Sequence, residues 1–238
     1  MVKRTTSKAS IDYKFNLKRV KQSASDVVFD ALREAIISGR LPAGTALIEA
    51  KLADEFGLSK TPIREALQRL TYSGLVDFEL AKGASVHIIT LDEVQHILEM
   101  QELLEPRALL QSAPLLTQSD LQSIQAVLEE AKNAIDQEDF QELSLLNNQF
   151  HEALYARAEN KLLVKWLNSL SEKRRMIYAS SVPLQKRSQI EWQEHQDILT
   201  AIQDQDYDYA AVRLGEHIHD FSNHLISLLL DDNKKVEE

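Results

Sequence analysis

Residues 58–67 read Leu58-Ser59-Lys60-Thr61-Pro62-Ile63-Arg64-Glu65-Ala66-Leu67. The stretch has the features of a helix start, because Ser59 and Thr61 are capping residues and Pro62 falls in the first turn, where its missing N–H costs nothing. Apolar residues then recur at helical spacing, at Ile63, Ala66, Leu67 and Leu70. The stretch therefore predicts a helix whose N-terminus offers N–H groups, hydroxyls and the cations Lys60 and Arg64 to an anion.

The sequence on either side predicts two more helices and a β-hairpin. The expected elements are a helix from its N-cap Ser25 to Gly39, a short helix over 49–56, and β-prone runs over 75–80 and 85–89. A turn with a basic, glycine-bearing tip, Ala81-Lys82-Gly83-Ala84, joins the two runs. Helix, short helix, tight turn, helix and hairpin is the order of a winged helix-turn-helix.

Seven residues of this unit are candidates for contact with DNA: Ser59, Lys60, Thr61, Arg64, Arg69, Lys82 and Gly83. Groups at a helix N-terminus suit phosphate and base-edge contact in a major groove, and a small hairpin tip suits close approach to a minor groove. In the alternative interpretation, the hydroxyls only cap the helix and the cations are ordinary solvated side chains. We favour DNA binding, because all seven fall on one docking surface.

The charge is distributed unevenly along the chain. The formal net charge of the whole is −10, but residues 1–90 hold 14 Lys and Arg against 10 Asp and Glu, a net +4, which leaves −14 for the remainder. A basic first third suggests an anion-binding module attached to an acidic domain. The opening 21 residues hold seven cations and a lone Asp12. We expect them to form a flexible arm that contacts phosphates, with a solubilising tail as the alternative.

Composition excludes several classes of protein. The chain has no cysteine, so disulfides and thiol chemistry are excluded, which fits a reducing compartment. It has 6 glycines and 5 prolines, where average usage predicts roughly 17 and 12, and so few breakers favour long helices over a β-sandwich or barrel. No apolar run approaches the roughly 18 residues of a membrane span, and the N-terminus lacks the apolar stretch of a signal peptide. We expect a cytoplasmic protein with no membrane partner.

The rest of the chain predicts a bundle of about six helices with short joints. The expected helices cover 92–112, 118–136, 139–158, 161–181, 186–204 and 207–230. Asp92, Ser119 and Asp139 are the expected caps, and Pro106 predicts a kink near Glu102. The fold class is therefore mainly α, in four segments: a basic flexible arm (1–21), a winged helix-turn-helix (22–90), a helical effector-binding and dimerisation domain (91–232) and a polar tail (233–238).

Three of the seven histidines fall where helical spacing turns them inward: His151, His195 and His217. Asn147 lies four residues before His151, so both side chains project from one face of a helix, one turn apart. Four potential ligands from three helices could converge inside a bundle, which is how such folds build a metal site. The alternative is that each inward histidine is a hydrogen-bonded core residue.

The N-terminal part resembles the DNA-binding domain of the GntR family of bacterial transcriptional regulators over residues 29–89. The resembling stretches are residues 32–44, Leu52-Ala53, residues 58–67, Gly74-Leu75-Val76 and Gly83-Ala84-Ser85-Val86. The resemblance places Lys60, Thr61 and Arg64 on DNA, with Lys82 and Gly83 at the wing. The family commonly has arginine in place of Lys60, and lysine cannot make the bidentate fork to guanine, so direct readout there is expected to differ.

The C-terminal part resembles the FCD domain, the all-helical effector-binding domain of the FadR/VanR-type branch of that family. The matching pieces are residues 147–151, 194–202 and 215–218. The resemblance implies a divalent metal held by Asn147, His151, His195 and His217, with Zn, Ni or Mn-like ions suited to this shell. Asparagine stands where the family often has aspartate. We therefore expect weaker metal binding and less repulsion of an anionic effector.

Arginines are the candidates for binding an effector carboxylate. The family often has an inward arginine on the first helix of this domain, where this chain has Gln101, with Arg107 one and a half turns further on. Arg174 and Arg175 on the fourth helix of the domain could instead supply the positive charge. Plain surface arginines are the alternative interpretation of both.

The sequence thus predicts a homodimeric, effector-responsive transcriptional regulator that grips a pseudo-palindromic operator in double-stranded DNA and binds a small carboxylate metabolite at a divalent metal site. One alternative is the same regulator with a metal-free pocket. The other is a metal-dependent hydrolase, which needs a general base near the metal-bound water. Glu152 and Glu194 adjoin the histidines, but neighbouring residues on a helix point in different directions. We therefore expect no enzymatic activity.

Overall fold

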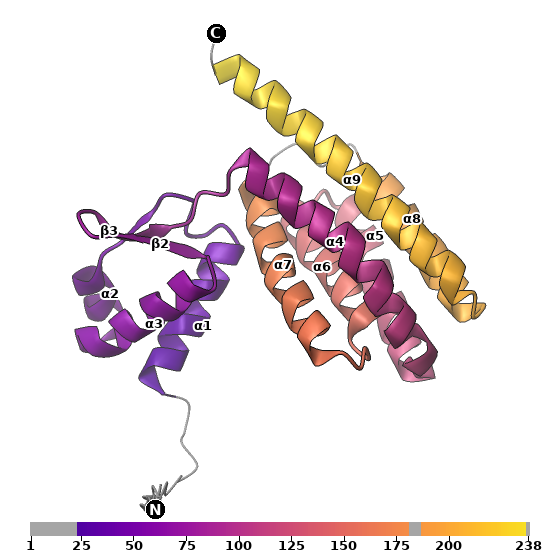
Figure 1. Ribbon diagram of the computed structural model, residues 1–238, viewed down its shortest axis with the longest axis horizontal. Helices are drawn as coiled ribbons and strands as arrows, with labels where there is room; N and C mark the ends of the chain where they lie inside the picture. Colours follow the sequence, from indigo (N-terminus) through magenta and orange to yellow (C-terminus); the bar gives the residue numbers. More distant parts are fainter. Residues whose placement is uncertain (1–22, 181–186, 237–238) are drawn as a thin grey trace, which may run out of the picture.

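A computed structural model describes residues 23–180 and 187–236, and their side chains over 23–177 and 187–230. Across these residues the chain forms nine α-helices and one small sheet (Figure 1). A unit of three helices and the sheet stands beside a bundle of six helices, which confirms the predicted fold class. The expected basic arm, 1–21, lies outside the described residues. Within them, no helix is both long and apolar enough to cross a membrane.

The N-terminal unit has the element order that the sequence predicts, with one strand added. Its elements are α1 (Ala24–Ile37), β1 (Ala46–Leu47), α2 (Glu49–Phe56), α3 (Lys60–Tyr72), β2 (Val76–Glu79) and β3 (Gly83–Val86). The sheet is antiparallel with the order β1-β3-β2, and Glu79 pairs with Gly83 at the hairpin tip. β3 therefore begins at Gly83, two residues before the predicted start. β1 was not predicted, because two residues are too few for a periodic signal.

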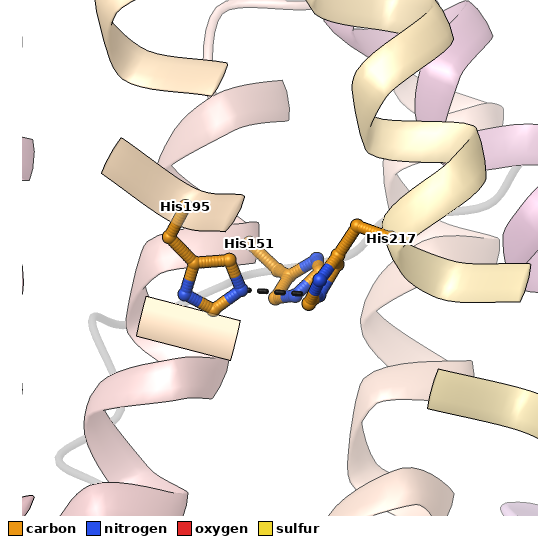
Figure 2. A group of neighbouring side chains, drawn as sticks. All are labelled: His151, His195 and His217. Carbon is orange, nitrogen blue, oxygen red and sulfur yellow. Dashed lines mark hydrogen bonds between the residues drawn. The ribbon is translucent and has the colours of Figure 1, made fainter. Parts of the chain in front are cut away.

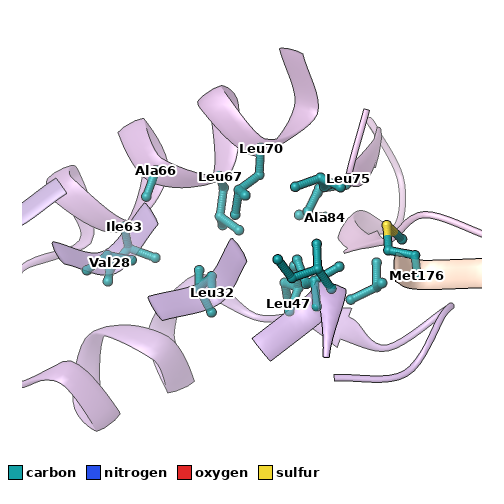
Figure 3. Close-up of a cluster of buried hydrophobic side chains, with 14 of the residues drawn as sticks. Val28, Leu32, Leu47, Ile63, Ala66, Leu67, Leu70, Leu75, Ala84 and Met176 are labelled. Carbon is teal, nitrogen blue, oxygen red and sulfur yellow. The ribbon is translucent and has the colours of Figure 1, made fainter. Parts of the chain in front are cut away.

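The core of this unit lies between α1, α3 and the sheet (Figure 3). Its fully buried members include Val28 of α1, Ile63 and Leu70 of α3, and Leu75 beside the sheet. One further member, Met176, comes from the helical bundle. The apolar periodicity of α3 therefore identified its core residues correctly, since Ile63, Ala66, Leu67 and Leu70 are all buried. It did not reveal the contribution from the second domain.

The bundle follows the predicted helices closely. Its elements are α4 (Leu91–Ser112), a 3₁₀ turn (Ala113–Leu115), α5 (Gln118–Asp136), α6 (Phe140–Tyr155), α7 (Lys161–Ser180), α8 (Ser188–Gln203) and α9 (Tyr207–Val236). α4 and α9 pack along each other, and α7 lies on the side that faces the N-terminal unit (Figure 1). α9 continues six residues beyond the predicted end at 230. The expected tail therefore begins inside a helix.

Three predicted helix caps were wrong by two residues. Ser23, Thr90 and Thr117 cap α1, α4 and α5, in place of Ser25, Asp92 and Ser119. In each case the carboxylate three positions after the cap accepts a hydrogen bond from the backbone N–H of the cap, which completes a capping box. Asp139 caps α6 as predicted, through a hydrogen bond from the backbone N–H of Glu142.

Candidate metal centre and DNA-facing surface

Three buried histidines meet at the centre of the bundle (Figure 2). His151 belongs to α6, His195 to α8 and His217 to α9, and none is more than 6% exposed. One nitrogen of each lies within 4.8 Å of the others, and the Nε2 atoms of His195 and His217 are 3.1 Å apart. The convergence predicted for these three side chains is therefore present in the fold.

Aromatic packing fixes the planes of the rings. Phe150, fully buried, stacks on His195 with 4.1 Å between ring centroids and 24° between planes. His151 meets His195 edge-on, with centroids 5.2 Å apart. Because Phe150 directly precedes His151 in α6, one turn of that helix both supplies one imidazole and supports another.

Carboxylates hold the outer nitrogens of two of the rings. Glu105 Oε2 lies 2.6 Å from His151 Nδ1, and Glu194 Oε2 lies 2.7 Å from His217 Nδ1. A proton on Nδ1 that is donated to a carboxylate leaves the lone pair on Nε2, which is the arrangement that metal-binding histidines use. The expectation that Glu194 points away from the histidines was wrong. Both His195 and its neighbour Glu194 lie on the side of α8 that packs against α9, and Glu194 contacts His217 there.

The environment keeps two of the histidines neutral. Burial lowers the pKa of His151 and of His195 well below the ordinary value, and the nearby positive charge of Arg174 acts in the same direction. Burial also raises the pKa of Glu105, against the opposing influence of Arg174. Because histidine binds metal only in its neutral form, burial prepares the ligands for an ion.

The residues present fit a divalent transition metal. Three imidazoles, two of them oriented by carboxylates, form a donor set suited to Zn, Ni or Mn-like ions. The fourth predicted ligand, Asn147, is on α6 one turn before His151, and its amide nitrogen lies 3.4 Å from Glu191 Oε2. A metal would bind Asn147 through the amide oxygen, Oδ1.

The three predicted effector arginines have different surroundings. Arg174 is buried, and its Nε and Nη2 donate to Asn148 Oδ1 at 3.2 and 2.8 Å. Its Nη1 is 3.8 Å from Glu105 Oε1. Arg175 instead pairs with Glu34 of α1 at 3.1 Å, and Arg107 is exposed on α4. The structure therefore brings only Arg174 among them to the surroundings of the histidines.

Sequence reasoning missed a second charged group beside the histidines. Glu191, one turn before His195 on α8, is 4% exposed, and its Oε1 has no hydrogen-bond partner. Burial raises the pKa of Glu191 to about 7. Arg187 donates to both carboxylate oxygens of Glu194 at 2.8 and 3.1 Å, and its Nε lies 3.8 Å from Glu191 Oε1. The spacing of four between Glu191 and His195 was the signal available in the sequence.

The predicted DNA-contact residues lie on the surface of the N-terminal unit. Ser59, Lys60 and Thr61 are exposed at the start of α3. Ser59 occupies the N-cap position, but its hydroxyl makes no capping hydrogen bond to the helix. Gly83 begins β3 with a φ of 85°, a left-handed conformation that favours glycine.

Each of the three remaining cations of this surface faces a carboxylate of its own domain. Two bonds join Arg64 to Glu49 at 3.0 and 2.8 Å. Lys82 pairs with Glu79 across the hairpin tip at 2.8 Å, and Arg69 pairs with Asp26 at 2.7 Å. All three cations are exposed, so each remains accessible to an approaching phosphate.

Comparison with known proteins identifies both halves of the chain. Residues 24–86 match the family described as bacterial regulatory proteins, gntR family, and residues 96–220 match the FCD domain. The HTH-type transcriptional repressor RspR of Escherichia coli K12 is 22% identical over 201 residues, which are 84% of this chain and 88% of that protein.

Solved structures agree with these matches. A GntR-family transcriptional regulator from Pseudomonas syringae pv. tomato DC3000 is 32% identical, with coverage of 90% and 89% and a TM-score of 0.51. McbR/YncC of E. coli shares the fold, with a TM-score of 0.76, 23% identity and coverage of 86% and 98%. These families and relatives are transcriptional regulators rather than enzymes. The chain therefore belongs to the GntR family of bacterial regulatory proteins and carries an FCD domain as its helical part.

Proposed function

We propose that this regulator binds a pseudo-palindromic operator as a homodimer and responds to a small carboxylate metabolite held at a divalent metal in its helical domain. In the proposed docking, the N-terminus of α3 enters the major groove with Lys60, Thr61 and Arg64, and the wing tip approaches the minor groove through Lys82 and Gly83. The exposure of Lys60, Thr61, Arg64 and Lys82 supports this docking.

The observation that carries the metal site is the pairing of His151 with Glu105 and of His217 with Glu194, each through Nδ1. Both pairs aim Nε2 away from the carboxylate, and burial has removed these rings from water. A metal bound by these rings and by Asn147 would supply a positive charge in an otherwise enclosed site. Such a charge, with Arg174 nearby, supports the choice of a carboxylate as the effector.

One observation favours a metal-free pocket as the second candidate. The Nε2 atoms of His195 and His217 are within hydrogen-bond distance, at 3.1 Å. If Nδ1 of His217 donates to Glu194, its Nε2 accepts, and His195 Nε2–H can donate to it. The two rings would then satisfy each other's hydrogen-bonding groups inside the core. Metal binding through His195 Nε2 would require the proton on that nitrogen to be lost or moved to Nδ1.

Metal analysis with thermal unfolding separates the two candidates. We expect purified protein to hold about one transition metal per chain, and a chelator to lower its melting temperature, since a ligand at 100 times its Kd stabilises by about 2.7 kcal/mol. The variant with His151, His195 and His217 all replaced by alanine should hold no metal and show no chelator effect. A matched control replaces the exposed His96 and His219. Equal metal content in all three proteins would refute the site.

DNA binding is tested by gel shift against DNA upstream of the gene's own locus. We expect sequence-selective complexes whose affinity falls steeply with salt. A complex with the mass of two chains per operator would support the dimer, whereas binding that is insensitive to both sequence and salt would defeat the proposal.

A further inference from the structure

Helix α7 contacts both domains through residues that are nearly adjacent in sequence. Figure 1 shows α7 on the side of the bundle that faces α1, and the two helices pack against each other. Arg174 of α7 points into the bundle, whereas its neighbours Glu172, Arg175 and Met176 contact the winged unit. One short segment of one helix is therefore shared by the candidate metal centre and the DNA-binding unit.

The contacts with the winged unit include two ion pairs and one core side chain. Glu172 Oε1 lies 2.6 Å from Arg33 Nη2, and Arg175 Nη2 lies 3.1 Å from Glu34 Oε1. Met176 is 7% exposed and belongs to the core of the winged unit, where its sulfur-bearing side chain reaches the end of the cluster (Figure 3). An interface with a side chain inside the opposite core cannot slide freely, because protein interiors are close-packed.

The contacts with the bundle lead directly to the histidines. Arg174 donates to Asn148 on α6, three residues before His151. Its Nη1 also faces Glu105, whose other carboxylate oxygen lies 2.6 Å from His151 Nδ1. A change in the position of the His151 ring would therefore displace the Glu105 carboxylate, and with it the guanidinium of Arg174 on α7.

We propose that α7 is the element that transmits occupancy of the histidine cluster to the DNA-binding unit. The proposal rests on the metal site proposed above, whose regulation it describes. One helix carries three consecutive residues with these contacts, Arg174, Arg175 and Met176. A displacement of Arg174 therefore moves the other two. They act on α1, which packs along the DNA-facing helix α3. The position of α3 relative to the bundle then depends on the metal centre.

A second connection runs through α4 and provides the competing route. His87, just after β3, lies 2.9 Å from Asp77 of β2 and 3.1 Å from Glu93 in the first turn of α4. α4 also carries Glu105, so it too joins the winged unit to the histidines. The experiment must therefore remove the contacts of α7 and leave those of α4 in place.

Hydrogen exchange of the full chain, with Zn²⁺ as the probe, tests the proposal. In chelator-treated wild-type protein, we expect added Zn²⁺ to change amide exchange in α1 by at least about threefold, as well as exchange around the histidines. The interface variant Glu172→Gln/Arg175→Gln/Met176→Ala should bind Zn²⁺ with unchanged affinity but lose the response in α1. Met176→Leu, which keeps the volume of the core side chain, should retain it. Lys165→Gln/Asn168→Ala, exposed on the same helix, is the matched control and should also retain it.

The outcomes are distinct. A response of α1 that survives in the interface variant would overturn the role of α7 and indicate the α4 route. Zn²⁺ binding by the wild type without any change in α1 would refute transmission and leave the metal site standing. Failure of the wild type to bind Zn²⁺, measured by calorimetry, would refute the metal site and the transmission together.

Discussion

Glu105 and His151 form a buried pair, with 2.6 Å between the carboxylate Oε2 and the ring Nδ1 and neither side chain more than 4% exposed. The carboxylate has a second set of partners, because its Oε1 accepts from Gln101 Nε2 at 3.0 Å and faces Arg174. Three helices, α4, α6 and α7, therefore meet at a single buried acid. Such a residue orients the imidazole and increases its strength as a ligand.

Replacing Glu105 with glutamine should weaken metal binding without removing a ligand. The amide keeps the shape of the side chain but not the charge that orients the Nδ1 proton of His151. We expect about a 10- to 100-fold loss in Zn²⁺ affinity, measured by competition with a chromophoric chelator. Glu102→Gln, at a partly exposed position on the same helix, is the control and should bind like wild type. Equal affinity in both variants would contradict the assignment of Glu105.

Arg64→Ala should weaken DNA binding for all sequences, as expected for a lost phosphate contact. We expect the slope of log affinity against log salt to become shallower by about 1, measured by fluorescence anisotropy over a salt series. Arg40→Ala removes the same charge from the exposed turn after α1 and serves as the control. If loss of Arg64 changed preference at one base pair and left the salt slope unchanged, the side chain would read a base instead.

Glu191 should make the metal-free protein less stable as pH rises. Burial raises the pKa of Glu191 from 4.5 to about 7 in the folded state. The unfolded chain therefore ionises this group first, and the contribution of Glu191 to the free energy of unfolding falls between about pH 4.5 and 7. Glu191→Gln should match wild type at pH 4 and exceed its stability at pH 8 by on the order of 3 kcal/mol. Urea unfolding at both pH values, with chelator present, measures this, and equal stability at pH 8 would refute it.

Phe150→Leu should loosen His195. The phenyl ring stacks on this imidazole, and leucine keeps the apolar character of the site but not the flat surface. We expect a loss of about 1–2 kcal/mol in stability and a weaker affinity for Zn²⁺. Leu146→Val, also in α6 and fully buried but outside the aromatic cluster, should lower stability alone. Similar Zn²⁺ affinities in the two variants would show that the stack does not position the ligand.

Helix periodicity predicted the nine helices, but local hydrogen bonds set their first residues. The true caps Ser23, Thr90 and Thr117 each have an acidic residue three positions later, so the capping-box pattern was present in the sequence. We predicted caps two positions further on, because those residues lie closer to the first apolar residues of each helix. In the structure, the reciprocal hydrogen bonds of the capping box decide where each helix begins.

The sequence predicted the convergence of the three histidines, but only part of the charged side chains around them. Glu105 lies on the buried stripe of α4 with Leu98 and Leu109, and a charged residue at an inward position was a usable signal. The separate roles of Arg174 and Arg175 were not predictable, because residues adjacent on a helix point about 100° apart and only the packing of α7 against α1 decides which one faces the bundle. Met176 was missed for the same reason.

Arg64, Arg69 and Lys82 each face a carboxylate, and we expect these pairs to affect how the protein searches a chromosome. A phosphate must share or displace the existing partner of each cation, so attraction to arbitrary DNA is weaker than the cations alone would produce. A target that also offers base-edge hydrogen bonds compensates for the exchange, and an unrelated sequence does not. We therefore expect brief residence at non-target positions, which leaves more molecules free to find the operator.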